Sequence, residues 1–287
     1  MSTHPARRLW AALETLHDVT YFDAEVRSAG IALGLKGYWM TYFAWRAAPL
    51  GPVPAAPVIA VFAGFHPGAV ARALPAAWSR ATPEACLEAR AAVSAAALAE
   101  AGADRRDCEQ AARILGPVAA AADPTGRPLF AANAAMALPA DPLGGLWQLA
   151  TTLREHRGDG HVAALVTEGI TGLQAHLLQA AAGRFPQAVI RLARPGWAEE
   201  EWAAAADALR GRGLLTEEPA LALTPAGHTV LDTVEAHTDE RAWSGGLSSL
   251  GEQGVEEVLA LLRPSVRAVA ASGMLPAINP VGLPVAG

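Results

Sequence analysis

Residues 197–235 read WAEEEWAAAADALRGRGLLTEEPALALTPAGHTVLDTVE, and this stretch decides the fold of the second half of the chain. Its first part, to Arg210, is rich in alanine and predicts a helix. Gly213-Leu214-Leu215 and Leu221–Thr224 flank the polar turn Thr216-Glu217-Glu218-Pro219, and they predict a hairpin of two short strands. Thr224-Pro225 then predicts the start of a long helix.

Two further helices are expected just before this stretch. Thr171 and Gln174 have the spacing of a capping box, which predicts a helix that ends near Gly183. A short helix follows over residues 187–194, before the Pro195-Gly196 turn. Three helices, a hairpin and a closing helix to about Trp243 are the element order of a winged helix.

The first half of the chain also has helical patterns. Apolar residues at three and four spacing predict a helix over 5–17, and a second helical run over 25–46 carries most of the aromatic side chains. Short helices are expected on either side of Phe65-His66-Pro67. Turn signals over 123–142 suggest a crossover, so we expect a helical domain at 1–140. The remainder, 141–287, is expected to hold a helical linker, a degenerate winged-helix module at about 170–243 and a C-terminal helix, in a mainly α fold.

Composition excludes several classes of protein. The formal net charge of −6, with Lys36 as the only lysine, disfavours a general polyanion binder. Only Cys86 and Cys108 are present, so neither a disulfide framework nor a cysteine zinc site is expected. No signal-peptide pattern follows Met1, and the uncharged stretch 47–71 is interrupted by prolines. We therefore expect a cytoplasmic protein that is not embedded in a membrane.

Common catalytic signatures are also missing. The sequence contains no P-loop, no dinucleotide-binding glycine motif, no G-x-S-x-G and no H-E-x-x-H. Nucleotide-driven, serine-hydrolase and zincin chemistry therefore have no support, and no metal ligand set is expected. The cofactor is unknown; haem with a histidine ligand is an option that no motif supports.

The segments ALRGRGLL (208–215), LALTPAGHTVLDTVE (221–235) and AHTDERA (236–242) resemble the wing region of multiple-antibiotic-resistance (MarR-type) regulators. The wider arrangement, with LHDVTYFD, GFHPGAVARALPAAW and LREHRGDGHVAAL ahead of that module, resembles a bacterial helix-turn-helix family of uncertain function. The first resemblance implies a DNA-binding dimer. The second covers nearly the whole chain and brings no known reaction or catalytic residues.

The charge of the module departs from that of a DNA reader. In winged helices the start of the third helix meets the base edges, and phosphate contacts supply much of the affinity. Here that helix starts with Glu199-Glu200-Glu201, and residues 185–243 contain five arginines against ten acidic residues. The wing is acidic as well. We therefore expect that the module does not bind DNA.

The most polar stretch of the chain is Arg154-Glu155-His156-Arg157-Gly158-Asp159-Gly160-His161. We expect a helix to end at Gly158 and Asp159 to cap the next one. In the functional interpretation, Arg154, Arg157 and His156 hold an anionic group and His161 acts as a base or ligand. In the structural interpretation, the same residues are a solvated helix end.

A second candidate site lies in the first half. His17 and His66 are candidate catalytic residues, although a buried histidine bonded to a backbone carbonyl is the commoner explanation for each. If both face the aromatic run, they enclose an apolar cavity with a few polar groups, which is the usual composition of a small-molecule site. The candidate ligand contacts there are Tyr21, Tyr38, Trp39 and Tyr42.

The leading hypothesis is a soluble protein that binds a small apolar or aromatic metabolite, with an anionic group as an option and catalysis left open. The winged-helix module then serves as a scaffold or dimer element. The alternative is a ligand-responsive MarR-like regulator that binds DNA as a homodimer. A third hypothesis is a non-catalytic interaction protein. The sequence names neither the ligand nor a reaction.

Overall fold

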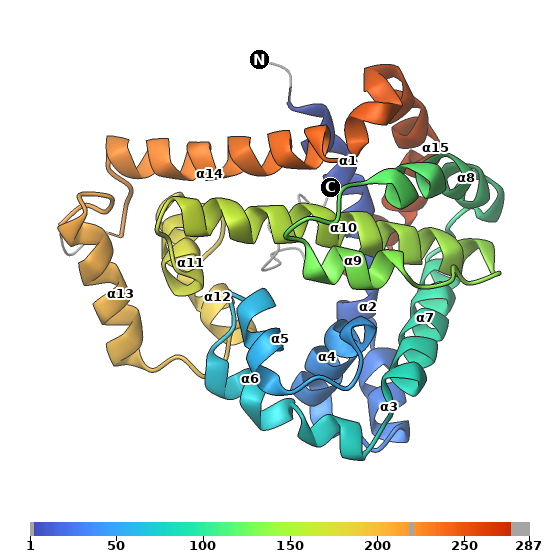
Figure 1. The fold of residues 1–287 in the computed structure, drawn as a ribbon, viewed down its shortest axis with the longest axis horizontal. Coiled ribbons are helices and arrows are strands. Elements are labelled where there is room, and N and C mark those ends of the chain that lie inside the picture. The colour runs from blue at the N-terminus through green and yellow to red at the C-terminus, as the bar shows by residue number, and fades with distance from the viewer. Residues whose placement is uncertain (1–2, 218–220, 277–287) are drawn as a thin grey trace.

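A computed structural model describes residues 3–217 and 221–276, and in these ranges the chain is mainly helical, as expected (Figure 1). The helices of the first half are α1 (Pro5–His17), α2 (Val19–Phe22), α3 (Glu25–Ala32), α4 (Gly37–Ala47), η1 (Ala48–Leu50), α5 (Ala55–Val61), α6 (Pro67–Ala73), η2 (Ala76–Ser79), α7 (Pro83–Glu100), α8 (Arg105–Ala121) and α9 (Pro128–Ala134). Those of the second half are α10 (Pro142–Thr167), α11 (Gly172–Ala181), α12 (Gln187–Ala193), α13 (Glu199–Gly211), α14 (Pro225–Ser244), η3 (Leu247–Leu250) and α15 (Gly251–Ala271).

The central element is α10, which crosses the middle of the molecule and packs against α1, α7, α8, α9 and α14 (Figure 1). The predicted helix end at Gly158 is wrong, because α10 continues through Gly158-Asp159-Gly160 without a break. Each glycine in a helix interior costs about 1 kcal/mol relative to alanine. Most residues of α10 are buried, and the burial of this segment outweighs that local preference.

The expected helix over 25–46 is also divided. It breaks into α3 and α4 at residues 33–36, where Gly34 and then Gly37 have φ values of 83° and 71°. Only glycine adopts this left-handed region without strain. The break turns the aromatic helix α4 so that Phe43 and Trp45 are buried, while Tyr38, Trp39 and Tyr42 are half-buried.

Three hydrophobic clusters hold the helices together. The first joins α1, α8, α10 and α15, and it includes Trp147 and Leu9, which are fully buried. The second joins α3 to α7 around Phe43 and Phe62. The third joins the end of α10 to α11, α12, α13 and α14 around Trp202.

The predicted winged-helix module covers α11, α12 and α13, followed by α14. The predicted capping box between Thr171 and Gln174 is present at the start of α11. The predicted hairpin of two strands is not seen among the described residues, where Leu215 and Leu223 form one isolated antiparallel bridge. Helix α13 ends at Gly211 and Thr224 caps α14, and the described segments between them are joined by the two backbone hydrogen bonds from Thr216 N–H to Ala222 and from Thr224 N–H to Leu214, which support one bridge. Glu218-Pro219 of the predicted turn lie outside the described residues.

Within residues 3–217 and 221–276 no helix is both long and apolar enough to cross a membrane. The proline-rich stretch that the sequence made improbable as a span is divided into η1, α5 and α6.

Candidate functional site

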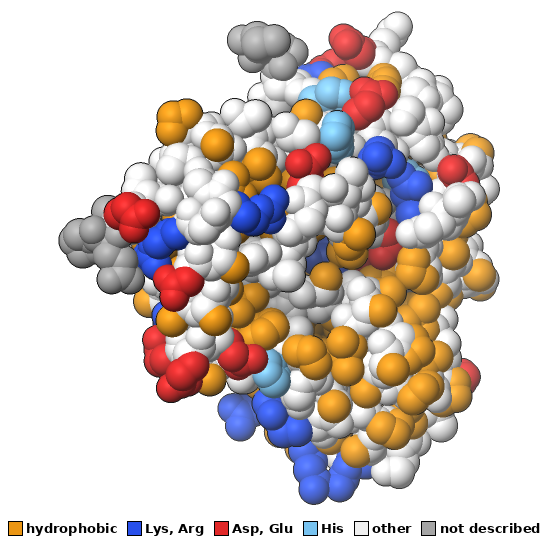
Figure 2. Space-filling view, turned by 60° about the vertical axis from the view of Figure 1, so that its left-hand side comes forward, with side chains coloured by type: hydrophobic (Ala, Val, Ile, Leu, Met, Phe, Trp, Pro, Cys, Tyr) orange, Lys and Arg blue, Asp and Glu red, His pale blue; other side chains and the backbone are white. Residues whose placement is uncertain are grey.

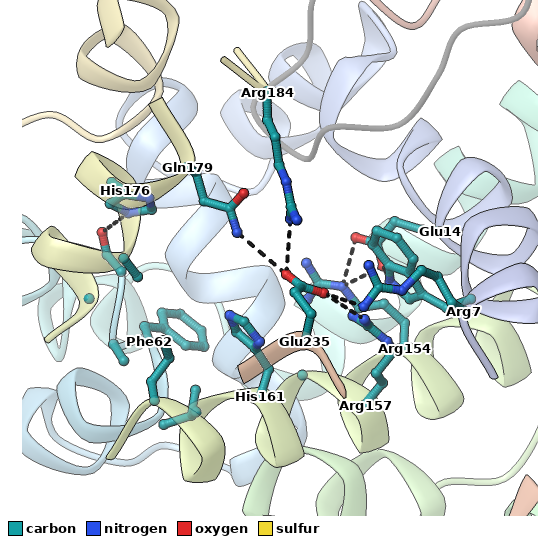
Figure 3. Close-up of a pocket in the computed structure, with 18 of the residues that line it drawn as sticks. Arg7, Glu14, Phe62, Arg154, Arg157, His161, His176, Gln179, Arg184 and Glu235 are labelled. Carbon is teal, nitrogen blue, oxygen red and sulfur yellow. Dashed lines mark hydrogen bonds and ion pairs between the residues drawn. The ribbon is translucent and has the colours of Figure 1, made fainter. Parts of the chain in front are cut away.

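A pocket of about 610 Å³ lies between α1, α10, α11 and the loop that joins α5 to α6. Its volume is within the range of small-molecule sites. Seven arginines line it: Arg7, Arg8, Arg46, Arg154, Arg157, Arg184 and Arg194. These side chains come from both halves of the chain, and α10 supplies the pocket floor in the view of Figure 3.

One group of arginines surrounds Glu235 of α14. Its carboxylate accepts hydrogen bonds from Arg7 at 2.7 Å and Arg184 at 3.2 Å, and from Gln179 at 3.4 Å (Figure 3). Arg157 reaches the same carboxylate at 3.4 Å. Burial by itself raises the pKa of Glu235, but His161 and the arginines outweigh it, so that the pKa is lowered. Glu235 is therefore ionised at neutral pH.

Asp239, one turn further along α14, completes this group. It accepts from Arg157 at 2.8 Å and from Arg7 at 2.7 Å, and it is 4% exposed. Three arginines thus share two carboxylates at this end of the pocket. The three arginines therefore carry one positive charge more than the two carboxylates neutralise.

A second group of arginines surrounds Glu155, which is 1% exposed. Arg46 binds it with two hydrogen bonds of 2.9 and 3.0 Å, and Arg154 binds it at 2.8 Å. Burial by itself raises the pKa of Glu155, but Arg46 and Arg154 lower it further than burial raises it. Arg154 also binds Glu14 of α1 at 3.0 Å, so two arginines face two carboxylates here.

Arg194 is the exception in the pocket. Arg8 pairs with Glu256, whereas no carboxylate among residues 3–217 and 221–276 forms an ion pair with Arg194. Within the described ranges, its one hydrogen bond goes to the carbonyl of its neighbour Ala193, at 2.8 Å. Burial lowers the pKa of Arg194, which is the expected cost of a cation without a counter-ion.

Aromatic rings hold three of the arginines in place. The guanidinium carbons of Arg46, Arg157 and Arg194 lie 4.4, 4.4 and 4.5 Å from ring centroids. Cation–π contacts of this kind are worth about 0.5–2 kcal/mol each. The three rings are those of Phe62, Trp10 and Phe65, which also line the pocket.

Two histidines line the pocket as neutral side chains. The Thr238 hydroxyl donates to the Val234 carbonyl at 2.7 Å, so at its 3.0 Å contact with His161 it must accept from Nδ1. Nε2 of His161 then carries the lone pair. Burial lowers the pKa of His161, and burial with Arg194 lowers the pKa of His176 to about 3.

The structure places Arg154, Arg157 and His161 of the predicted set on the wall of this pocket. They lie on one continuous helix instead of the solvated turn that the sequence suggested, and Arg157 is 9% exposed. Asp159 caps no helix, because it lies inside α10, where Oδ2 accepts from the Phe130 backbone at 3.0 Å.

The other predicted histidines lie elsewhere. His156 faces away from the pocket, against the ring of Phe130 at 4.7 Å, and burial lowers its pKa to about 4. His17 is 2% exposed, bonded to Thr151 at 2.9 Å and stacked on Trp147. It lies in a packed interior instead of the expected cavity wall, since it does not line the pocket.

His66 has a structural role. Its Nδ1 accepts from the Gly68 backbone at 3.0 Å, so the side chain caps the start of α6. Nε2 lies 3.5 Å from Glu201, and the ring packs edge-on against Trp197 at 4.8 Å. The expectation that His66 and His17 face one cavity is therefore wrong.

The predicted aromatic contacts form a cluster behind the pocket wall. Tyr42 lies 5.2 Å from Phe65 and 4.8 Å from Tyr21, between ring centroids. Tyr38 and Trp39 pack against Tyr42 at 6.2 and 5.8 Å. None of these four residues lines the pocket itself.

Sequence reasoning missed most of the residues that line the pocket. Arg7, Glu14, Arg46, Arg194 and Glu235 each look like ordinary surface residues of an amphipathic helix, and nothing in their local sequence brings them together. One signal was available. Arg46 and Arg194 stand beside apolar or aromatic residues, which is an unusual place for a solvated charge.

The predicted winged-helix module is docked on the loop between α5 and α6. His176 of α11 donates from Nε2 to the Gly64 carbonyl at 2.9 Å. At Gly172 an added Cβ would lie 1.8 Å from the Ala63 carbonyl oxygen, so only glycine permits this approach. The turn before α13 is in contact too, through Trp197 and His66.

The exposed face of α13 carries acidic and small side chains. Its outward residues are Glu199, Glu200, Ala203, Ala204, Asp207 and Ala208. Figure 2 shows acidic side chains gathered below the grey segment at the left of the view, over this part of the molecule. Glu199 and Glu201 pair with Arg191 and His66, both within the protein.

The three-helix module α11–α13, its bridge and the long α14 define a helix-turn-helix protein built around an arginine-lined pocket. A model of a helix-turn-helix family matches residues 6–276, so the chain belongs to that family. The match extends over the pocket as well as the module. No curated protein and no solved structure matches the chain significantly.

Proposed function

We propose that this protein binds a small organic anion with an apolar or aromatic body in the arginine-lined pocket. The observation that carries the proposal is the charge balance of the pocket wall. Seven arginines line it, and five carboxylates pair with six of them. The excess cations are held in a partly desolvated site, where an anion gains more than it does in water.

The apolar part of the ligand is suggested by the rings between the charges. Phe62, Phe65 and Trp10 present flat surfaces, and each already carries an arginine on one face. A planar ligand can stack on the same guanidinium groups while its anionic group binds them edge-on. This combination favours an aromatic acid over inorganic phosphate.

Catalysis at this site remains an open part of the proposal. His161 supplies a neutral imidazole whose Nε2 lone pair is available, and the adjacent arginines are suited to stabilising negative charge. No second group with the geometry of a nucleophile lies beside it among the described pocket residues. We therefore propose a binding function in preference to a catalytic one.

We further propose that the helix-turn-helix module forms a wall of the pocket and does not read DNA. Three carboxylates on the outward face of α13 would approach phosphates, and the nearby cations Arg191 and Arg210 are already paired with Glu199 and Asp207. The contacts of His66 with Trp197 and of Gly64 with His176 also tie the module to the first half of the protein.

The second candidate is a ligand-responsive, MarR-like regulator that binds DNA as a dimer. Membership of a helix-turn-helix family favours it. So does the shared position of α11, which lines the pocket and packs against α13. In this candidate, occupancy of the pocket changes the position of α13.

The first experiment tests the ligand site, which both candidates share. The purified protein is extracted with denaturant, and released small molecules are identified by mass spectrometry and titrated back by calorimetry. A bound organic anion, whose affinity falls by about tenfold or more in Arg154→Ala and is unchanged in the exposed Arg113→Ala, supports the proposal. Equal affinity in both variants contradicts the site.

DNA binding is tested in parallel. Selection from a random duplex pool, with and without the anion, should enrich no sequence. One enriched site with an affinity of about 10 nM at physiological salt would establish the regulator instead.

A further inference from the structure

Behind Phe65, the pocket adjoins a group of polar side chains that lack partners. Asp18, between α1 and α2, is 1% exposed, and neither of its carboxyl oxygens has a hydrogen-bond partner. The Nε atom of Arg194 is likewise buried without a partner. A buried polar group that is left unpaired costs about 1–3 kcal/mol. Two unpaired groups of this kind close to one pocket are hard to explain by a structural role alone.

Tyr38 and Tyr42 pack close to Phe65 and Arg194. Tyr42 packs on Phe65 at 5.2 Å, and Arg194 lies 4.5 Å over that same ring. Tyr38 packs beside Tyr42 at 6.2 Å. Within the described part of the chain, the hydroxyl groups of Tyr38 and Tyr42 form no hydrogen bond. Neither tyrosine lines the pocket, so both belong to the layer behind its wall.

These groups are close enough to influence one another. Arg154 and Arg194 act on the charge of Asp18, and Asp18 and Arg194 act on Tyr38. Burial, with the charge of Glu14, raises the pKa of Asp18 well above its ordinary value. A protonated Asp18 is a hydrogen-bond donor. A neutral Asp18 also leaves the charge of Arg194 uncompensated, so the ligand group that Arg194 suits in the pocket is an anionic acceptor.

We infer that Arg194, with Asp18, Tyr38 and Tyr42 behind it, forms a carboxylate-binding subsite for an aromatic carboxylic acid whose ring lies along Phe65. This inference rests on the proposed function, because it names the ligand class and its orientation in the same pocket. The carboxylate pairs with the one pocket arginine that lacks an acidic partner among the described residues. Asp18, Tyr38 and Tyr42 do not line the pocket, so they act on the ligand only through Arg194 and Phe65.

The Glu235 end of the pocket is the competing position for the carboxylate. There Arg7, Arg157 and Arg184 also exceed their carboxylates by one charge. Each of those arginines nevertheless has a short contact with Glu235 or Asp239 already. Arg194 gains a charged partner without breaking any existing ion pair, so its end of the pocket is favoured.

The test compares two probes of the same shape, 2-naphthoate and its neutral analogue 2-naphthamide, by calorimetric titration. The wild-type protein should bind the carboxylate about tenfold or more tightly than the amide. Arg194→Gln should reduce that ratio to about one, and Arg194→Lys should restore part of it. Far-ultraviolet circular dichroism and thermal unfolding confirm that each variant is folded.

Four further variants locate the carboxylate. Arg184→Ala, at the other end of the pocket, and Arg113→Ala, on the exposed surface of α8, should both keep the wild-type ratio. Asp18→Asn keeps a neutral polar side chain of the same size behind Arg194 and should also keep the ratio, while Asp18→Ala leaves a space there and should lower naphthoate affinity by about threefold or more.

The outcomes separate this inference from the function on which it rests. If the wild-type protein binds neither probe, or binds both equally, the proposed anion site itself is wrong. If the ratio survives in Arg194→Gln and is lost in Arg184→Ala, the anion site stands and the carboxylate lies at Glu235. If Asp18→Asn destabilises the free protein as much as Asp18→Ala, Asp18 is an ionised partner of Arg194 and the subsite is refuted.

Discussion

Replacing Glu155 tests whether the arginines of the pocket depend on a buried counter-charge. Glu155 is 1% exposed and accepts three hydrogen bonds of 2.8–3.0 Å from Arg46 and Arg154. Alanine at this position leaves Arg46 without an acidic partner, while Arg154 keeps Glu14. Breaking one side of a buried ion pair costs about 3–5 kcal/mol. This is a large fraction of the roughly 5–15 kcal/mol that stabilises an ordinary protein.

Guanidinium denaturation followed by circular dichroism measures that cost. We expect Glu155→Ala to lower the free energy of unfolding by about 3 kcal/mol or more, with an unchanged slope. Glu109→Ala is the matched control, since it removes the exposed pair with Arg113 and should cost about 0.5 kcal/mol or less. In a double-mutant cycle, Glu155→Ala should cost clearly less when Arg46 is already alanine.

A loss below about 1 kcal/mol in Glu155→Ala would refute the reasoning. It would mean that water reaches Arg46 and Arg154 freely, and that the pocket is less desolvated than its burial indicates. The isosteric Glu155→Gln keeps the volume and removes only the charge. A similar loss in both variants assigns the effect to charge instead of packing.

Three further outcomes concern pH and backbone packing. Folding lowers the pKa values of Glu155 and Glu235, so their ionised forms stabilise the folded protein. This contribution to the free energy of unfolding is complete above the unfolded pKa of about 4.3 and is lost as the pH falls from there through the folded pKa. A free energy of unfolding that stays constant down to about pH 3 would contradict this prediction. Burial raises the pKa of Asp159 to about 6, so Asp159 lowers stability progressively as the pH rises from the unfolded value of about 3.9 to about 6. The gain in stability from Asp159→Asn should therefore be larger at about pH 8 than at about pH 4. Gly172→Ala places a Cβ 1.8 Å from the Ala63 carbonyl oxygen and should lower the melting temperature by several degrees. Gly211→Ala is the control, because no atom lies within 4 Å of its added Cβ, and it should change stability by about 1 kcal/mol or less. Equal effects of the two substitutions would refute the docking of α11.

The fold was predictable wherever one helix face is buried. The helix over 5–17 and the module over 171–211 follow from apolar spacing and from caps such as Thr171. The continuity of α10 was not predictable, because a helix that is buried on most sides has no apolar stripe and Gly158 and Gly160 favour a break. The division into 1–140 and 141–287 remains a prediction.

The site was predictable only in part, for a related reason. Arg154, Arg157 and His161 were found because they are concentrated in one segment. Their partners Glu14 and Glu235 lie far away along the chain, and each has a plausible role as a surface residue. His66 was misassigned because a histidine that caps a helix through its ring nitrogen cannot be distinguished by sequence from a histidine in a pocket.

The pairing of α1 with α15 constrains the order in which this chain can fold during synthesis. Leu9 and Leu13 of α1 share a cluster with Val258 and Leu262 of α15, and Arg8 pairs with Glu256. A ribosome adds about 5–20 residues per second, so α1 waits on the order of ten seconds or more for its partner. During that interval its apolar face is open to chaperones and to other nascent chains. Deletions that remove α15 should therefore reduce the yield of soluble protein before they affect any pocket residue.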